Sequence, residues 1–230
     1  MEYYYFNDRN YPIRVTENTL QITPYTFQQN GQLWEQPSLF QFFSNIDNQT
    51  PYNIVDIGAQ SGLYSLFAKY LPLSTFYAFE PFPATFELLN DNITLNNITN
   101  VKTFNLAISN TQGISTLNTS ANHNGLHTLG KNPLRFNDIN PIDVNTTTLD
   151  IVFKDIPVHY IKIDTEGYEY YILQGGESII EKYKPVIQME YNIKNMKQCS
   201  VTEEMIHEFV KKINYKIISY AEEEMLIGPA

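Results

Sequence analysis

An alternation of short apolar runs with segments of helical spacing, beginning near residue 51, limits the possible folds of this chain more than any other feature. Runs typical of buried strands lie at 52–57, 75–79, 101–107, 158–163 and 185–191. Segments with helical spacing lie at 61–70, 83–96, 168–183 and 202–213. Strands joined through helices form a parallel sheet that is covered on both faces. We therefore predict a doubly wound, Rossmann-like α/β fold, and two further runs at 215–219 and 224–227 predict that its mostly parallel sheet has an antiparallel final strand.

Two segments depart from this alternation. Residues 1–48 are polar and rich in Gln and Asn, and we interpret them as an N-terminal cap on a main domain of residues 49–230, with a short amphipathic helix at 38–47. Residues 118–145 interrupt the alternation, and this stretch is too long for an ordinary connection. Two interpretations stay open for it: a lid over a substrate, and a floppy surface insertion.

The charge of the chain excludes one large class of partners. It has 25 Asp and Glu residues against 15 Lys and Arg, so the formal net charge is −10. A field of this sign repels phosphate backbones, and we expect no binding to nucleic acid. The single cysteine, Cys199, excludes an intrachain disulfide and a cysteine-rich zinc cluster. Since no apolar run approaches the ~18 residues of a membrane helix and the first residues lack a signal-peptide pattern, we expect a cytoplasmic protein without a membrane partner, of open oligomeric state.

The turn after the first predicted strand indicates the class of cofactor. Gly58 and Gly62 permit a tight turn and a close approach of the backbone to a ligand. Gln60 replaces the middle glycine of the dinucleotide-binding motif, and no Gly-Lys-Ser/Thr of a P-loop follows. The Asp56 carboxylate opposes a pyrophosphate but suits a cation. The turn therefore favours S-adenosylmethionine, which carries a sulfonium and no phosphate.

Glu80 ends the second predicted strand, where an acid can accept hydrogen bonds from both hydroxyls of a ribose. This feature alone fits NAD equally well, so an NAD-dependent oxidoreductase is an alternative, against which the turn from Asp56 to Gly62 argues. The structural alternatives are a turn-capping role for Asp56 and a solvated strand-end position for Glu80.

The sequence resembles the FkbM family of S-adenosylmethionine-dependent methyltransferases over about residues 50–192. The matching motifs, in chain order, are VDIGAQSGLYS at 55–65, AFEP at 78–81, LAIS at 106–109 with Gly113, TTLD at 147–150, IKIDTEGYE at 161–169 and PVIQME at 185–190. Many methyltransferases share the first motif, whereas IKIDTEG with TLD before it is much more specific. Gln60 and Ser61 depart from the residues common in the family, and residues 118–145 match weakly, so the resemblance does not name the substrate.

The resemblance implies a class I methyltransferase fold, S-adenosylmethionine as cofactor, and O-methylation of a hydroxyl of a sugar, a glycan or a related small molecule. It assigns the methionine part and the ribose of the cofactor to Asp56, Gly58, Ala59, Gln60, Ser61, Gly62 and Glu80. Phe82 would flank the adenine, with core packing as the alternative, and Asn105 and Ala107 would border it. Glu35 is a candidate to reach the amino group of the cofactor from the cap, and a solvent-exposed acid is the alternative.

Methyl transfer to an alcohol needs a base within hydrogen-bond reach of the hydroxyl. Asp164 ends the fourth predicted strand beside the expected cofactor site, and Glu166 follows in the same turn. Two acids this close can have separated pKa values, which leaves one of them able to accept a proton. We predict Asp164 as base or substrate orienter and Glu166 as its partner; the alternative for Glu166 is a helix cap.

Other residues near this turn have open roles. Lys162 would pair with one of the acids or touch the substrate, unless it snorkels to solvent. His127 is a candidate general base, and a surface histidine is the alternative. Asp164, Glu166 and Glu190 form an alternative Mg²⁺ site, although we favour a site without metal. The last functional alternative is a non-catalytic partner of a glycosyltransferase that keeps the fold but binds S-adenosylmethionine weakly or not at all.

Overall fold

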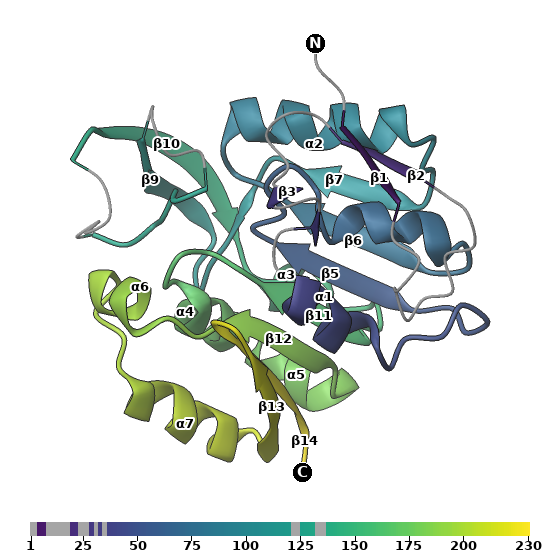
Figure 1. Ribbon diagram of the computed structural model, residues 1–230. Coiled ribbons are helices and arrows are strands. Elements are labelled where there is room, and N and C mark those ends of the chain that lie inside the picture. Colours follow the sequence, from purple (N-terminus) through teal and green to yellow (C-terminus); the bar gives the residue numbers. More distant parts are fainter. Residues whose placement is uncertain are drawn as a thin grey trace.

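Seven strands form the central sheet of the computed structural model, in the order β13-β14-β12-β11-β5-β6-β7 (Figure 1). Their bounds are Asn53–Ile57 (β5), Thr75–Phe79 (β6), Val101–Phe104 (β7), Tyr160–Ile163 (β11), Val186–Glu190 (β12), Tyr215–Ala221 (β13) and Glu224–Pro229 (β14). The strands from β7 across to β12 pair in parallel, and β14 pairs antiparallel with β12 and β13. The predicted mostly parallel sheet with an antiparallel final strand is confirmed.

The structure describes residues 36–120, 125–131 and 137–230, and before them the backbone of four short strands. These strands are β1 (Tyr4–Asn7), β2 (Thr19–Ile22), β3 (Gln28–Gln29) and β4 (Gln32–Leu33), which pair as two antiparallel hairpins. Glu35, a predicted cofactor contact, lies outside the described residues. No helix in the described ranges combines the length and apolar character that a membrane crossing requires.

The strand order reverses between β5 and β11, and this reversal decides where a ligand can bind. From β5 the chain adds β6 and β7 on one side, then returns to place β11 and β12 on the other. The backbone N–H of Asp164, directly after β11, donates to the carbonyl of Ile57 at the end of β5, at 2.9 Å. The carboxyl ends of β5 and β11 therefore lie side by side, at the position where open α/β sheets bind ligands.

Helices cover both faces of the sheet, as doubly wound folds require. One face packs against α1 (Gln36–Phe43), the 3₁₀ helix η1 (Ser65–Tyr70) and α2 (Pro83–Leu95). The other face packs against α3 (Leu149–Val152), α4 (Glu169–Gln174), α5 (Glu177–Tyr183), α6 (Ile193–Gln198) and α7 (Glu203–Lys212). The predicted helix at 61–70 is a turn followed by η1, and the helical segment at 168–183 is two helices. The short helices α3 and α6 were not predicted.

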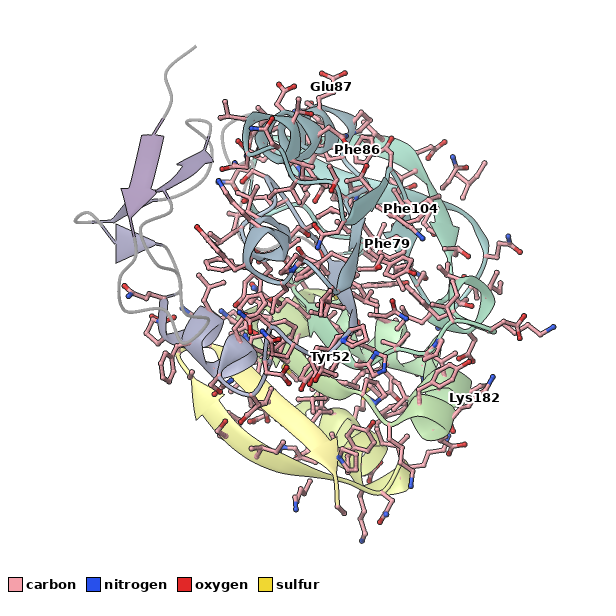
Figure 2. The ribbon with its side chains drawn as sticks, turned by 90° about the vertical axis from the view of Figure 1, so that its right-hand side faces the viewer. Tyr52, Phe79, Phe86, Glu87, Phe104 and Lys182 are labelled. Carbon is pink, nitrogen blue, oxygen red and sulfur yellow. The ribbon has the colours of Figure 1, made fainter. Side chains whose placement is uncertain are left out.

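The side-chain alternation of the strands divides the core between the two faces. On β5, Ile54 packs under α1 and η1, whereas Val55 and Ile57 pack under the helices of the other face. Figure 2 shows Phe79 of β6 beside Phe104 of β7, with stacked rings whose centroids are 4.8 Å apart. The two apolar clusters lie on opposite faces of the sheet, and the buried carboxyls of Asp56 and Glu190 lie near the carboxyl ends of their strands.

Residues between β7 and α3 form a second, smaller sheet in addition to the main one. It contains β8 (Ala107–Ile108), β9 (Gly113–Ser120) and β10 (Ile139–Thr147), in the order β8-β10-β9. Figure 1 shows β9 and β10 standing apart from the main sheet. We call β9, residues 125–131 and β10 the β-arm. The predicted strand at 101–107 is thus split after Phe104, and the division into cap, main domain and insertion stays a prediction.

Helix α1, which precedes residue 49, packs its apolar side chains into the core on one face of the sheet. Phe42 is 2% exposed, and its ring packs edge-on against those of Phe43 and Tyr64. Truncation of Phe42 to alanine leaves a cavity, so we expect F42A to lower the free energy of unfolding by about 3–5 kcal/mol. Phe40 lies on the same helix but is 53% exposed, and we expect F40A to change it by less than about 0.5 kcal/mol. Urea denaturation measures both; equal losses would contradict this account of α1.

Candidate functional site

A cavity of about 640 Å³ opens at the carboxyl ends of β5, β6, β11 and β12. Its wall consists of the turns after these strands, the start of β8, residues 125–129 of the β-arm, the first turn of α1 and the turn between β13 and β14. The volume lies within the range that holds a cofactor together with part of a substrate. The strand ends that the sequence singled out thus converge on one cavity.

The turn after β5 is fixed by its backbone. Gly58 has φ +74°, and a Cβ atom there would overlap the carbonyl oxygen of Asp164. Gln60 also has a positive φ, of 49°. Gly58, Ala59 and Gln60 line the cavity, whereas Ser61 and Gly62, two predicted cofactor contacts, lie behind its wall. A Cβ on Gly62 would meet the Leu89 side chain of α2, so this glycine serves helix packing.

Asp56 is buried at the end of β5, at 3% exposure, and lines the cavity. Its Oδ2 accepts a hydrogen bond of 2.6 Å from Oγ of Ser65, in η1. Burial raises the pKa of Asp56 to about 6, although the hydrogen bond from Ser65 and the charge of Lys162 oppose the shift. Asp56 therefore ties the turn to η1 as well as presenting negative charge to the cavity.

Glu80 joins two backbone segments at the end of β6. Its Oε1 accepts from the N–H of Phe82 at 2.9 Å, and its Oε2 accepts from the N–H of Gln60 at 3.0 Å. Burial raises the pKa of Glu80 to about 7, against the effect of these two hydrogen bonds. Asn105 lies outside the wall and donates to the carbonyls of Glu80 and Pro81 at 2.8 and 2.9 Å, so it positions this strand end. The carboxyl of Glu80 is held in one orientation on the cavity wall.

Phe82 and His127 bring the β-arm against the end of β6. Their ring centroids are 4.4 Å apart in an edge-on arrangement, and Phe82 packs beside Leu129 and Ala107. His127 and Ala107 line the cavity, whereas Phe82 stands behind them. Nε2 of His127 is buried and has no hydrogen-bond partner in the described part of the chain, and burial lowers the pKa of this imidazole. His127 thus lines the cavity as a partly buried residue, and its role as a general base stays a prediction.

Lys162 is an ion-paired lysine, which rules out snorkelling. It is 1% exposed, and its Nζ lies 2.5 Å from Oε1 of Glu224 and 3.4 Å from Oδ2 of Asp164. The ammonium also lies 5.0 Å from the ring centroid of Tyr64. The prediction that Lys162 pairs with a neighbouring acid is confirmed, and the shorter contact is to Glu224, which the sequence did not indicate.

Asp164, Glu166 and Glu190 present carboxylates to one end of the cavity. Nδ2 of Asn195, in α6, donates to Oε2 of Glu166 at 2.7 Å and to Oε1 of Glu190 at 2.5 Å. Burial raises the pKa of Glu190 well above its usual range, and the charges of Glu169, Asp164, Glu166 and Glu224 add to the shift. Glu166 has φ +56°, so the turn after β11 holds it in a conformation that few side chains adopt.

Four functional neighbours escaped the sequence analysis. Ser65 lies within the motif at 55–65, but the sequence did not indicate that its hydroxyl donates a hydrogen bond to Asp56. Glu224 was assigned to a closing strand, and only the pairing of β14 beside β12 brings it to Lys162. Asn195 lies in an unpredicted helix, and Gln188 reaches Tyr64 across the sheet face. Their positions depend on tertiary pairing, for which local patterns carry no signal.

Comparison with known proteins identifies similar chains. A family model described as the methyltransferase FkbM domain matches residues 56–217. Methyltransferase 1 of Beauveria bassiana is 28% identical, and methyltransferase sdnD of Sordaria araneosa is 29% identical. Each alignment covers 53% of this chain, with 57% of the first relative and 59% of the second. The chain thus spans between one half and three fifths of the length of these relatives.

Two solved structures share the fold. The methyltransferase FkbM of Methylobacillus flagellatus KT has a TM-score of 0.55 at 14% identity, covering 84% of this chain and 48% of that chain. An uncharacterized protein of Listeria monocytogenes serotype 4b has a TM-score of 0.51 at 14% identity, covering 86% and 69%. At these identities the likeness concerns the fold alone, and it confirms the predicted Rossmann-like arrangement.

The close approach of the turns after β5 and β11 is testable at Gly58. Because a Cβ there would strike backbone and need a positive φ, we expect G58A to lower the free energy of unfolding by more than about 2 kcal/mol. In the control G228A, the nearest obstacle is the end of the half-exposed Ile218 side chain, which can move. Thermal unfolding of both variants measures the difference, and a G58A protein as stable as G228A would refute the proposed contact.

Proposed function

Because the chain belongs to the family of methyltransferases with an FkbM domain, we propose that it transfers a methyl group from S-adenosylmethionine to a hydroxyl of a sugar, a glycan or a related small molecule. The observation that carries this proposal is the placement of Glu80 and Asp164 on one cavity wall, at the switch in strand order. The carboxylate of Glu80 would accept hydrogen bonds from the ribose hydroxyls of the cofactor. The carboxylate of Asp164 would accept the proton of the acceptor hydroxyl.

The residues of the cavity fit S-adenosylmethionine in charge and in shape. Among the described residues, the wall carries eight carboxylate side chains and one lysine: Asp56, Glu80, Asp164, Glu166, Glu190, Glu222, Glu223, Glu224 and Lys162. This excess of negative charge attracts a ligand with a sulfonium and an ammonium group. Ala107, Leu117 and Leu129 offer an apolar surface for the adenine. The same excess disfavours an acceptor that carries phosphate or carboxylate groups.

The chain contributes orientation and a proton acceptor to the reaction. When bound, S-adenosylmethionine supplies a methyl group on a positively charged sulfur, open to in-line displacement by an alcohol oxygen. Oδ2 of Asp164 faces the ammonium of Lys162 at 3.4 Å, which leaves Oδ1 as the candidate atom to accept the proton of the acceptor hydroxyl. Lys162 is itself held by Glu224, so it orients Asp164 without needing a contact to the substrate. Residues 125–129 of the β-arm line the adjoining wall, where they would help to keep water from the reacting groups.

The raised pKa of Glu80 predicts how cofactor binding depends on pH. Only the carboxylate form can accept from both ribose hydroxyls, and the pKa of about 7 means that this form is lost as the pH falls below 7. We expect the affinity for S-adenosylhomocysteine to fall about tenfold between pH 8 and pH 6. Titration calorimetry at both pH values measures this change.

The matched variants are E80Q and E87Q. Glu87 lies at the exposed surface of α2, as Figure 2 shows, and E87Q should keep the wild-type pH profile. E80Q should bind S-adenosylhomocysteine at least about tenfold more weakly at pH 8, because the amide is uncharged and has only one oxygen that can accept a hydrogen bond. Its affinity should also depend less on pH, since the amide does not titrate. An E80Q protein with wild-type affinity and pH profile would show that Glu80 does not hold the ribose.

The role of Asp164 predicts a loss of turnover without a loss of cofactor binding. We expect D164N to lower the rate of methyl transfer by about 10²–10⁴-fold, since an amide accepts no proton, while its affinity for S-adenosylhomocysteine changes less than about threefold. Transfer of a labelled methyl group to a panel of free sugars and glycosides measures the rate. The control D155N changes an exposed acid before β11, at the other end of that strand, and should retain the wild-type rate. An unchanged rate in D164N would exclude it as the base.

A further inference from the structure

Asp164 belongs to a cluster of three carboxylates that lie closer together than proton transfer alone requires. Asp164, Glu166 and Glu190 each offer one oxygen atom, and these three atoms lie within 4.8 Å of one another. Oxygens bound to one Mg²⁺ at about 2.0–2.1 Å lie up to about 4 Å apart, and those bound to a larger cation at about 2.3–2.6 Å lie up to about 5 Å apart, so the spacing is close to that of one shared coordination sphere. Like charges at this separation repel one another unless a cation lies between them.

Glu190 adds an observation that does not depend on the clustering. The residue is 8% exposed, and its Oε2 atom is buried with no hydrogen-bond partner among the described residues. A buried carboxylate oxygen that accepts no hydrogen bond is costly, and such groups in native proteins are usually paired or bound to metal. Glu190 lines the same cavity as Asp164 and Glu166, so a ligand entering the cavity can reach it.

Two neighbouring side chains, those of Asn195 and Lys162, contact these carboxylates. Asn195 donates to both Glu166 and Glu190, and so holds two of the three side chains toward a common point. Amide contacts of this kind are typical of the shell that orients metal ligands. The neighbouring Lys162 makes its shorter ion pair with Glu224, at 2.5 Å, against 3.4 Å to Asp164. Lys162 thus divides its charge between Asp164 of the cluster and Glu224 outside it.

We propose that Asp164, Glu166 and Glu190 bind one hard divalent cation. Such cations prefer oxygen ligands and keep several water molecules, which leaves positions that oxygens of an acceptor can take. This site differs from the metal-free one that the sequence favoured. Its use in catalysis rests on the proposed function: a cation beside Asp164 would bind the acceptor hydroxyl and lower its pKa, so the proton leaves more readily for the carboxylate. Cation binding itself needs neither cofactor nor acceptor.

The probe is Mn²⁺ alone, added to the full chain after removal of metals with a chelator. Electron paramagnetic resonance of free Mn²⁺ counts the bound ions, and we expect one per chain. E190Q and E166Q should each weaken binding by at least about tenfold, because each loses one anionic ligand. E208Q changes an exposed acid of α7 and should bind as the wild type does. Glu166 is only half-buried, so E166Q carries the test if E190Q fails to fold, as circular dichroism will reveal.

The outcomes separate this proposal from the proposed function. One saturable Mn²⁺ site that is lost in both variants supports it. Absence of saturable binding to the folded chain, or binding that is unchanged in E166Q and in any folded E190Q, would overturn it. S-adenosylhomocysteine is titrated into the same metal-free samples, and failure of that binding counts against the proposed function alone. Loss of S-adenosylhomocysteine binding in E190Q, with no Mn²⁺ binding to the wild type, would assign the cluster to the cofactor's ammonium group and likewise overturn the cation site.

Discussion

The contact between the turns after β5 and β11 is the constraint on which the rest of the site depends. Gly58 has no room for a Cβ atom against the carbonyl of Asp164, and the Asp164 N–H is bonded to Ile57. This contact brings the proposed cofactor turn and the proposed base into register without any ligand. Glu80 extends the same arrangement, since its carboxyl bridges the turn after β5 to the chain after β6. The site is therefore preorganised by backbone, which suits a displacement that depends on alignment.

Negative charge is the second organising feature, and it acts through burial. Burial raises the pKa values of Asp56, Glu80 and Glu190, and the charges of neighbouring carboxylates add to each shift. Such a cavity favours ligands that bring positive charge. The proposed sulfonium cofactor and the proposed divalent cation would both meet this demand, at the ends of different strands: β5 and β6 for the cofactor, β11 and β12 for the cation. Both proposals thus follow from one electrostatic property.

The sequence predicted the parts of this molecule that local patterns encode. The strand and helix alternation gave the sheet, and the motifs around Asp56, Glu80 and Asp164 gave three positions on the cavity wall. It did not predict that 113–120 and 139–147 form strands, because their polar, threonine-rich composition lacks the alternation of a half-buried strand. Nor could it place Asn195 or Glu224, whose roles arise from pairing between distant segments. Ser61 and Gly62 stay predictions as cofactor contacts, and Gly62 also shows that a motif position can serve packing, because a Cβ there would meet Leu89.

The central claim is that the cavity at the strand switch holds S-adenosylmethionine with its ribose on Glu80 and its sulfur toward Asp164. A crystal structure of the full chain grown with S-adenosylhomocysteine tests this claim most directly. The account predicts both ribose hydroxyls within hydrogen-bond distance of the Glu80 carboxylate, and the sulfur on the side of the cavity that Asp164 lines. Density for the ligand elsewhere, or a ribose turned away from Glu80, would contradict it.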